Sequence, residues 1–233
     1  MKYALVDGKR AQAEPNLIGK CRICGADMIA RCGKIKVWHW SHKGKRFCDR
    51  YWEKETEWHR EWKNRFPDSW QEAVLKDTNT GEKHIADVCT EDGFVLEFQY
   101  SHISAEEQEA RERFYRRMVW VLNGVRRKFD YNRFYKGLSN FISTEQRGIF
   151  FVNFPDECFP LSWIDRSVPV FFDFEGTHES DPDISSNVVW GLLPGRQQGK
   201  AISLCVLKDQ FVEFATNGTL FEKLNKINKF SKM

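Results

Sequence analysis

The sequence lacks a hydrophobic run long enough to cross a bilayer, and its start does not follow the pattern of a secretory signal peptide. It also lacks an even set of cysteines that could be used up in disulfides. Its 7 cysteines in 233 residues indicate a reducing compartment, in which thiols serve as metal ligands or core residues. We therefore expect a cytoplasmic protein without a membrane segment.

No large excess of one charge is present either. There are 36 Lys and Arg against 33 Asp and Glu, a net charge of +3, so charge alone does not indicate a nucleic-acid partner. The basic residues nevertheless concentrate in residues 31–50 and 111–128. Each cluster taken singly is more commonly a solvated face, whereas two clusters in a balanced chain suggest a phosphate-facing surface.

A Cys-x-x-Cys-Gly motif occurs early in the chain and is followed by a Trp-His-Trp-Ser-His motif and a further cysteine. Two thiols with two residues between them form a tight knuckle that presents both sulfurs to one ion, and a His/Cys half completes a tetrahedron. A pair of buried thiols with two surface histidines is the alternative. We predict a zinc site whose ligands are Cys21, Cys24, His42 and Cys48. His39 competes for the third place, and Cys32 fits less well.

Residues 52–66 are predicted to form a helix. Trp58, Trp62 and Phe66 recur at four-residue steps and should face the core. Glu55, His59 and Lys63 form a neighbouring stripe with the same spacing, which either supports the helix through charge pairs or belongs to a site. Glu57 falls on the far face and should be solvated. Residues 70–75 should then form a strand.

A hairpin follows, and the rest of the chain is organised around it. Residues 94–101 alternate between apolar and polar side chains, which predicts a strand with one buried side, and Glu91–Gly93 form the turn that precedes it. In this register Asp87 lies opposite Glu97, roughly 5 Å away at Cβ. Carboxylates that close repel one another unless a cation lies between them, so we predict a divalent-metal site. Acids on a solvated hairpin face are the plainer alternative.

A second helix is predicted to start at Ser104, where Ser104–Glu107 has the spacing of a capping box. It continues through Tyr115, and residues 118–122 form an apolar strand. Helix, strands, helix and strand in this order predict an α/β fold with a mixed sheet.

The motifs from residue 1 to about residue 124, in this order and spacing, resemble the competence protein CoiA family. They are Cys21-x-x-Cys24-Gly25, Trp38-His-Trp-Ser-His42, Glu55-Thr-x-x-His59-x-x-x-Lys63, Ala86-Asp87-Val88, Glu97-Phe-Gln99-x-Ser101-x-Ile-Ser104, Arg111-x-x-x-Tyr115 and Val119-Trp-Val-Leu122. That family is assigned to the PD-(D/E)XK, restriction-endonuclease-like nuclease superfamily. The resemblance implies a restriction-endonuclease-like core with a mixed sheet flanked by helices.

The resemblance also implies roles for single residues. Glu55 would be the helix acid, Asp87 the central metal-binding acid and Glu97 the second acid, together holding Mg²⁺ or Mn²⁺. Gln99 would stand where most of the superfamily has Lys, and His59 would lie beside the metal. Tyr100 departs from relatives that often have Cys there. The residues expected to contact nucleic acid are Lys43, Lys45, Arg46, Lys63, Arg111 and Tyr115.

We therefore expect a zinc-binding β module over residues 1–50, a nuclease core over 51–124 and a C-terminal α+β extension over 125–233. In the extension, strands are predicted at residues 148–154, 168–174, 201–207 and 210–214, and no function is assigned. The expected function is metal-dependent hydrolysis of DNA, in DNA uptake or in defence against foreign DNA. The alternative is a nuclease-fold adaptor, weak or inactive in catalysis, that delivers DNA to recombination proteins.

Overall fold

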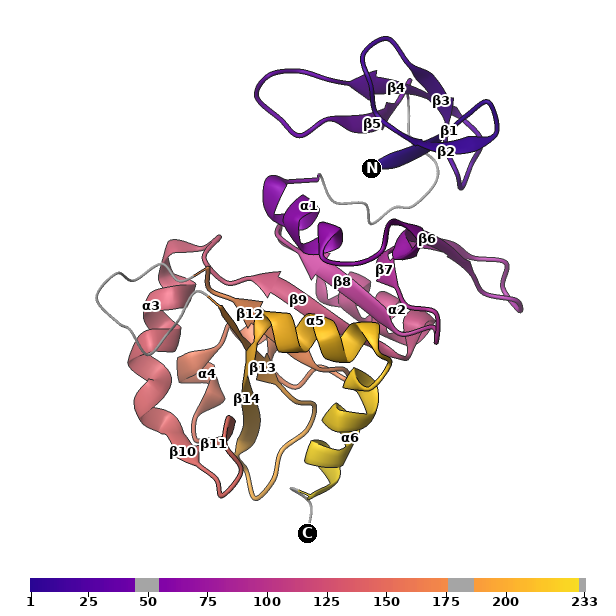
Figure 1. Cartoon of the computed structure of the whole chain (residues 1–233). Helices are drawn as coiled ribbons and strands as arrows, with labels where there is room; N and C mark the ends of the chain where they lie inside the picture. Colours follow the sequence, from indigo (N-terminus) through magenta and orange to yellow (C-terminus); the bar gives the residue numbers. More distant parts are fainter. Residues whose placement is uncertain (45–54, 176–186, 231–233) are drawn as a thin grey trace. The chain divides into compact units, whose positions relative to one another are not determined.

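A computed structural model of the chain describes residues 1–44, 55–175 and 187–230 (Figure 1). It divides into two compact units, unit 1 (Met1–Cys89) and unit 2 (Thr90–Met233), and we describe each by itself. The predicted segment 51–124 is thus shared between them. The prediction of an α/β protein with a large mixed sheet, flanking helices and a small antiparallel sheet is confirmed.

The small sheet of unit 1 has five antiparallel strands in the order β2-β1-β3-β4-β5. Its core is small and includes Ala4, Met28 and Trp40, all fully buried, together with the thiol of Cys21. The chain leaves β2 at Gln12 and enters β3 at Ile18, and Pro15 lies in the turn between them. The strands are β1 (Tyr3–Val6), β2 (Lys9–Gln12), β3 (Ile18–Lys20), β4 (Asp27–Arg31) and β5 (His39–His42).

Unit 1 continues with helix α1 (Glu57–Asn64) and the antiparallel strands β6 (Gln71–Lys76) and β7 (Lys83–Cys89). The helix begins at Glu57 because the Thr56 hydroxyl caps it by accepting the backbone N–H of His59 at 3.3 Å. Glu55 therefore precedes the helix, whereas the prediction placed it inside; residues 52–54 lie outside the described part. The predicted buried stripe of Trp58, Trp62 and Phe66 and the exposed Glu57 are confirmed.

In its described residues, unit 2 contains seven strands in the order β10-β11-β14-β13-β12-β9-β8. The strands β8, β9 and β12 run parallel, and each further pair is antiparallel. The strands are β8 (Val95–Gln99), β9 (Met118–Asn123), β10 (Phe141–Ser143), β11 (Ile149–Val152), β12 (Val170–Asp173), β13 (Val188–Leu192) and β14 (Ala201–Leu207). The helices are α2 (Ala105–Tyr115), α3 (Lys128–Gly137), α4 (Pro155–Cys158), α5 (Lys208–Thr216) and α6 (Leu220–Phe230).

The turn before β8 and the cap of α2 agree with their predictions. Gly93 has a φ of +78°, and the backbone N–H of Thr90 donates to the Phe94 carbonyl at 2.9 Å. The Ser104 hydroxyl accepts the N–H of Glu107 at 3.2 Å. Strand β8 itself differs, because both of its faces are buried instead of one, as is usual for strands in the parallel part of an α/β sheet.

The C-terminal half extends the same sheet, because β12 pairs with β9 in parallel with Val170 beside Trp120. The predicted strands at residues 148–154, 168–174 and 201–207 are confirmed. The predicted strand at 210–214 is wrong, since these residues belong to α5. Phe211 and Ala215, one helical turn apart, are buried there, and the Phe211 ring packs 4.7 Å from that of Phe171.

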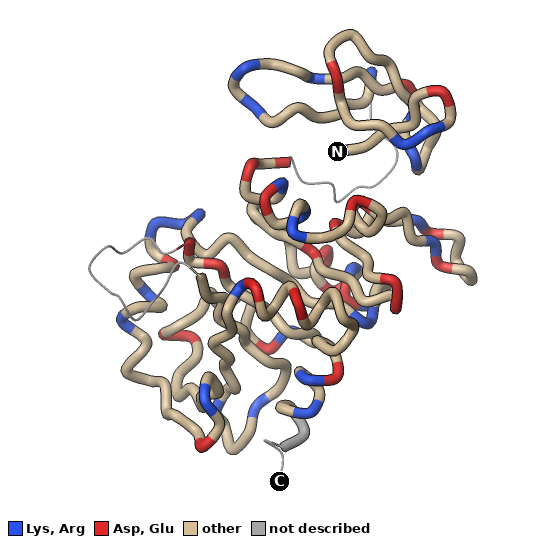
Figure 2. The backbone as a smooth tube through the Cα atoms, viewed as in Figure 1, with Lys and Arg blue, Asp and Glu red and all other residues tan. Residues whose placement is uncertain are grey.

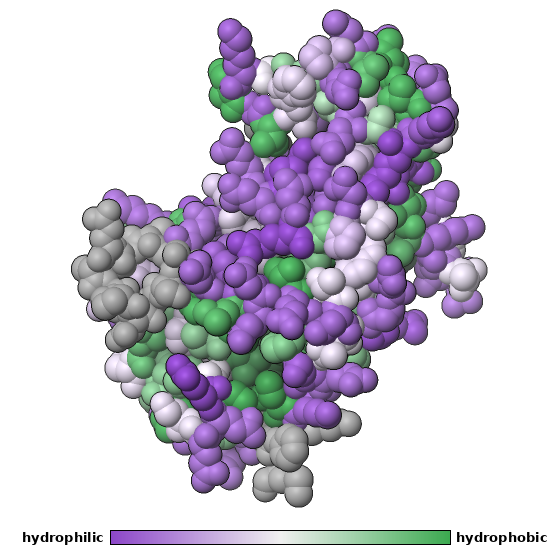
Figure 3. Space-filling view, viewed as in Figure 1, coloured by the Kyte–Doolittle hydropathy of each residue, from purple (hydrophilic) through white to green (hydrophobic). Residues whose placement is uncertain are grey.

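The surface of unit 2 is hydrophobic in places. An open groove lined by Ile149, Phe151, Ile202 and Ile227 runs beside β11, β14 and α6, and Figure 3 shows hydrophobic residues around these strands. None of the helices in the described ranges is long and apolar enough to cross a membrane.

Candidate metal and charge centres

The turn between β3 and β4 carries the predicted zinc knuckle. The Cys21 N–H donates to the Ala26 carbonyl at 2.8 Å, and the Gly25 N–H donates back to the Cys21 carbonyl at 3.0 Å. Gly25 has a φ of +72°, the conformation that favours glycine. The Ile23 N–H points at the Cys21 sulfur at 3.4 Å. The backbone thus holds Cys21 and Cys24 in one tight turn.

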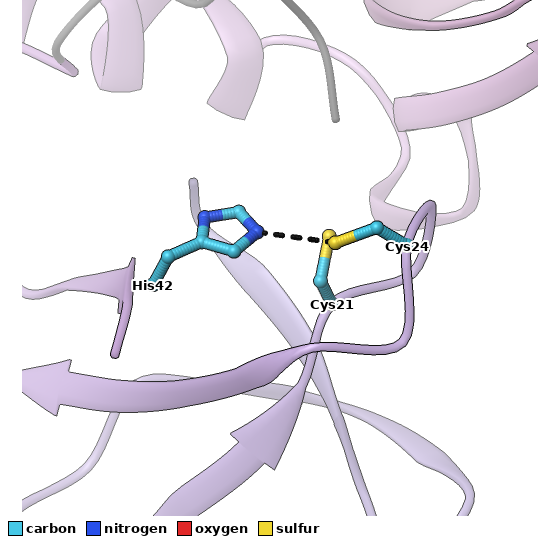
Figure 4. Close-up of side chains that lie close together, drawn as sticks. All are labelled: Cys21, Cys24 and His42. Carbon is cyan, nitrogen blue, oxygen red and sulfur yellow. Dashed lines mark hydrogen bonds between the residues drawn. The ribbon is translucent and has the colours of Figure 1, made fainter. Parts of the chain in front are cut away.

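His42, at the end of β5, brings a third ligand to this turn. Its Nε2 lies 3.5 Å from Sγ of Cys24, and the ligand atoms of Cys21, Cys24 and His42 all lie within 4.8 Å of one another (Figure 4). Tetrahedral zinc, with bonds of about 2.3 Å to sulfur and about 2.05 Å to nitrogen, separates such ligand atoms by about 3.6 Å. The fold therefore brings together three of the four predicted ligands in a spacing that suits a metal ion.

The other candidate ligands have different surroundings. Cys48 lies outside the described residues, so its place in the site stays a prediction. Nδ1 of His39, the competing ligand, lies 2.9 Å from the Val37 carbonyl, and neither His39 nor Cys32 belongs to the cluster. The two histidines alternate along β5, which explains how one of them reaches the knuckle while the other does not.

A second centre in unit 1 is a buried ion-pair cluster around Lys63. The Lys63 ammonium lies 2.9 Å from Oε1 of Glu55 and 3.1 Å from Oε1 of Glu72, and all three side chains are buried. Oδ1 of Asp87, on β7, lies 3.9 Å from the same nitrogen, and the Asp87 side chain is 24% exposed. Two of the three predicted metal-binding acids therefore converge on one ammonium group.

Glu72, on β6, is a member of this cluster that sequence reasoning missed. Its carboxylate accepts the backbone N–H groups of Lys2 at 2.5 Å and Tyr3 at 3.0 Å, so it ties β1 to β6. Its φ of +49° is a strained conformation for a residue with a side chain. No local pattern distinguishes this acid in the sequence, because its partners lie 9 to 70 residues away.

The charges of the cluster stabilise one another. Burial alone raises the pKa of Glu55, but the positive charges of Lys63, the N-terminal amino group and Arg60 together outweigh it and hold that pKa well below its usual range. The pKa of Glu72 is lowered for the same reason. Burial alone lowers the pKa of Lys63, and the carboxylates of Glu72, Glu55 and Asp87 raise it above its usual value. The cluster is therefore ionised at neutral pH.

We expect Lys63→Met to destabilise unit 1 by about 3–5 kcal/mol, because it leaves buried carboxylates without this counterion. In the wild type, acids with a lowered pKa contribute stability that is present above the unfolded pKa of about 4.3 and is lost as the pH falls. In the variant, burial and the charge of Glu55 should raise the pKa of Glu72, whereas Glu55 keeps Arg60, whose Nε lies 2.8 Å away. The stability that Glu72 contributes should then be lost as the pH rises from about 4.3 towards neutrality. Melting temperatures between pH 4 and pH 8 measure both trends.

The control for this variant is Lys76→Met, the same change at an exposed position on β6. It should melt within a few degrees of the wild type at every pH. Equal pH profiles for Lys63→Met and the wild type would contradict the counterion role of Lys63.

The resemblance implies that His59 lies beside the metal, whereas in the structure its side chain contacts Thr56 at the start of α1. Its Nδ1 lies 2.8 Å from the Thr56 hydroxyl and 3.3 Å from the Thr56 backbone nitrogen, and its side chain is buried. These contacts form a capping box at the start of α1, with His in the place usually taken by Glu or Gln.

In unit 2, Glu97 and Gln99 are on β8 and both are buried. Oε2 of Glu97 lies 2.5 Å from Nη1 of Arg111 on α2, whose Nη2 contacts Glu107 at 3.0 Å. The Gln99 amide donates to the Ser101 carbonyl at 3.0 Å. Asp87 belongs to unit 1, so the pairing of Asp87 with Glu97 across the hairpin stays a prediction.

The residues predicted to contact nucleic acid are mostly inaccessible in the described structure. Lys63, Arg111 and Tyr115 are buried, the first two in ion pairs with acids. Lys43 is exposed after β5, and Lys45 and Arg46 lie outside the described residues.

Comparison of the chain with protein-family models, curated proteins and solved structures finds no match. The similarity to the CoiA family therefore rests on the motifs alone and stays a prediction, as does the restriction-endonuclease-like fold.

Proposed function

We propose that the protein is a cytoplasmic, Mg²⁺- or Mn²⁺-dependent nuclease that hydrolyses phosphodiester bonds of DNA. The observation that carries this proposal is the convergence of Glu55 and Asp87 on Lys63. An acid before a helix and an acid on a strand, 32 residues apart, lie around one cationic group. Carboxylate oxygens are the ligands that Mg²⁺ and Mn²⁺ prefer.

Asp87, Glu97 and Glu55 would hold the ion, with help from the backbone carbonyl of Val88 or Phe98. When bound, the ion lowers the pKa of a water molecule and polarises the phosphoryl oxygen. Gln99 would orient the attacking water through its amide, which carries no charge. Lys63 compensates the acids Glu55, Glu72 and Asp87 and supplies a positive charge that Gln99 lacks.

The zinc knuckle is proposed to be a structural site. A bound zinc ion would join the β3–β4 turn to the end of β5 and so close the small sheet. Exposed Lys43 directly follows the ligand His42, and with Lys45 and Arg46 it would contact the phosphate backbone of DNA.

The second candidate function is a nuclease-fold adaptor that binds DNA and delivers it to a recombination or defence protein. The specific observation in its favour is the Glu97–Arg111 pair, because a guanidinium at 2.5 Å already neutralises the second acid. Metal binding at Glu97 must compete with this cation. In an adaptor, the Arg111 guanidinium would neutralise Glu97 permanently, and no metal ion would bind there.

The test is incubation of the purified protein with linear and circular DNA, single- and double-stranded, with Mg²⁺ or Mn²⁺. Metal-dependent cleavage supports the nuclease. Salt-sensitive DNA binding without cleavage of any of these substrates supports the adaptor.

We expect Gln99→Ala to lower the cleavage rate by roughly 100-fold, the effect of deleting one oriented polar group at a reacting centre. Single-turnover rates measure this effect. DNA affinity, measured in Ca²⁺ to hold the metal site without supporting chemistry, should barely change because basic side chains dominate it.

The matched control is Gln210→Ala, at an exposed position on α5, which should cleave at the wild-type rate. Gln99→Glu should be slower than Gln99→Lys, because a further acid repels the anionic phosphate. A wild-type cleavage rate in Gln99→Ala would show that Gln99 has no role in catalysis and is only a polar residue of strand β8.

A further inference from the structure

Unit 2 has a pocket at the carboxyl ends of its parallel strands. It is lined by Gln99 at the end of β8, Asn123 at the end of β9 and Phe172 near the end of β12. Ligands of open α/β sheets commonly bind at this edge, where the loops that follow the strands surround a crevice. The pocket lies wholly in unit 2, so its description needs no other part of the chain.

The size of the pocket limits what it can hold. Its cavity volume is about 40 Å³. A single water needs about 10–15 Å³ on this measure, so the space equals about three waters. A nucleobase or a sugar ring is too large for it, whereas a compact tetrahedral anion fits.

The lining combines buried apolar residues with exposed polar ones. Trp163, Phe172 and Ile103 are its buried apolar members. The polar part includes the hydroxyls of Ser101 and Ser162 and the imidazole of His102, all on exposed residues. Hydroxyl and ring N–H groups are donors that suit phosphate oxygens.

Two arginines, Arg126 and Arg127, line the pocket and are exposed, so their guanidinium groups can reach a ligand at its open side. Figure 2 shows this stretch as a basic segment at the turn into α3. Within residues 1–44, 55–175 and 187–230, neither arginine forms an ion pair, although the charges of both act on the Asp130 carboxyl. The carboxylate of the lining, Asp130, lies 3.6 Å from Arg133. The charge balance of the lining therefore favours an anion.

The loop that carries the arginines is held in place. The Asn123 side chain accepts the Val125 N–H at 3.1 Å, and the Gly124 N–H donates to the Asp173 carbonyl at 2.7 Å. A Cβ on Gly124 would lie 2.4 Å from the ring of Phe174, so only glycine allows this close approach of the loop to the strand edge. A preformed loop lowers the entropic cost of ordering the arginines around a ligand.

We infer that this pocket binds a phosphomonoester group, with the arginines pairing with its oxygens and the rest of the ligand outside the cavity. Planar guanidinium groups bind phosphate through paired hydrogen bonds, and a terminal phosphate carries more charge than a phosphodiester. The phosphate can be the end of a nucleic-acid strand or a free ion. This inference goes beyond the proposed nuclease and does not depend on metal binding.

The test is calorimetric titration, without added divalent metal, with three probes: a 5′-phosphorylated DNA tetranucleotide, the same tetranucleotide without the phosphate, and inorganic phosphate. We expect the phosphorylated probe to bind at least 10-fold more tightly than the unphosphorylated one. The double variant Arg126→Ala/Arg127→Ala should abolish that difference, while Arg147→Ala, an exposed arginine outside the lining, should keep it.

Inorganic phosphate distinguishes the two sources. If it binds as tightly as the phosphorylated probe, the free ion is the ligand; if it binds more weakly, the strand end is. Equal binding of the two tetranucleotides to the wild type would overturn the inference, and so would an unchanged difference in the double variant. Asp87→Asn, which removes a proposed metal ligand of unit 1, should bind the phosphorylated probe like the wild type. The titration therefore still tests the phosphate pocket if the nuclease proposal fails.

Discussion

Asp87→Asn is expected to lower the rate of metal-dependent DNA cleavage by about 100-fold or more, because it removes a charged ligand of the proposed ion. The fold should remain intact. Asparagine has the shape of aspartate, and Glu55 and Glu72 still neutralise the buried Lys63 ammonium at 2.9 and 3.1 Å. The same variant should lose the increase in melting temperature that Mn²⁺ gives the wild type.

Asp87 is a cleaner target than Glu97 for this experiment. Glu97 is 1% exposed and pairs with Arg111, so Glu97→Gln also leaves a buried guanidinium with one fewer partner. That loss is expected to cost about 3–5 kcal/mol of stability. A lower cleavage rate in Glu97→Gln could then come from unfolding instead of from loss of a metal ligand. The Asp87 side chain is 24% exposed, which leaves it accessible to a solvated ion.

The control for Asp87→Asn is Asp209→Asn, the same change at an exposed position in the first turn of α5. It should cleave DNA and respond to Mn²⁺ like the wild type. If Asp87→Asn keeps the full Mn²⁺-dependent increase in melting temperature, Asp87 does not bind the ion, and the adaptor becomes the better proposal.

Cys24→Ser is expected to remove zinc and to unfold much of the small sheet. The sheet has five strands of 3 to 5 residues, and a core of this size does not stabilise a module well without a covalent or metal cross-link. A zinc ion bound by Cys21, Cys24 and His42 would connect β3, β4 and β5. Hydrogen-exchange protection of these strands should fall by about 100-fold or more, equal to roughly 2.7 kcal/mol.

The matched control is Cys32→Ser in the same module. Cys32 is half-buried against the same core and lies outside the thiol–imidazole cluster, so zinc content and protection should stay close to wild type. Zinc is measured by elemental analysis of freshly purified, unchelated protein. Absence of zinc from the wild type, or equal protection in Cys24→Ser and Cys32→Ser, contradicts the zinc site.

The sequence alone determined the features that depend on near neighbours. The Cys21–Gly25 knuckle, the Gly93 turn and the Ser104 cap each use hydrogen bonds between residues no more than five positions apart. Strand β14 follows from a short apolar run, and the buried Trp58–Trp62 stripe follows from the four-residue spacing of its members. In such cases the types and spacing of neighbouring residues are enough to predict the local structure.

The tertiary structure decided what depends on distant partners. Glu72 became part of the Lys63 cluster because β1 supplies two N–H groups to it, and residues 210–214 became helical because Phe211 packs on Phe171. The burial of β8 on both faces, and the arginines at the ends of the parallel strands, likewise follow from how the strands of unit 2 assemble. These outcomes come from burial and from charges brought together by the fold, and a window of a few residues contains neither.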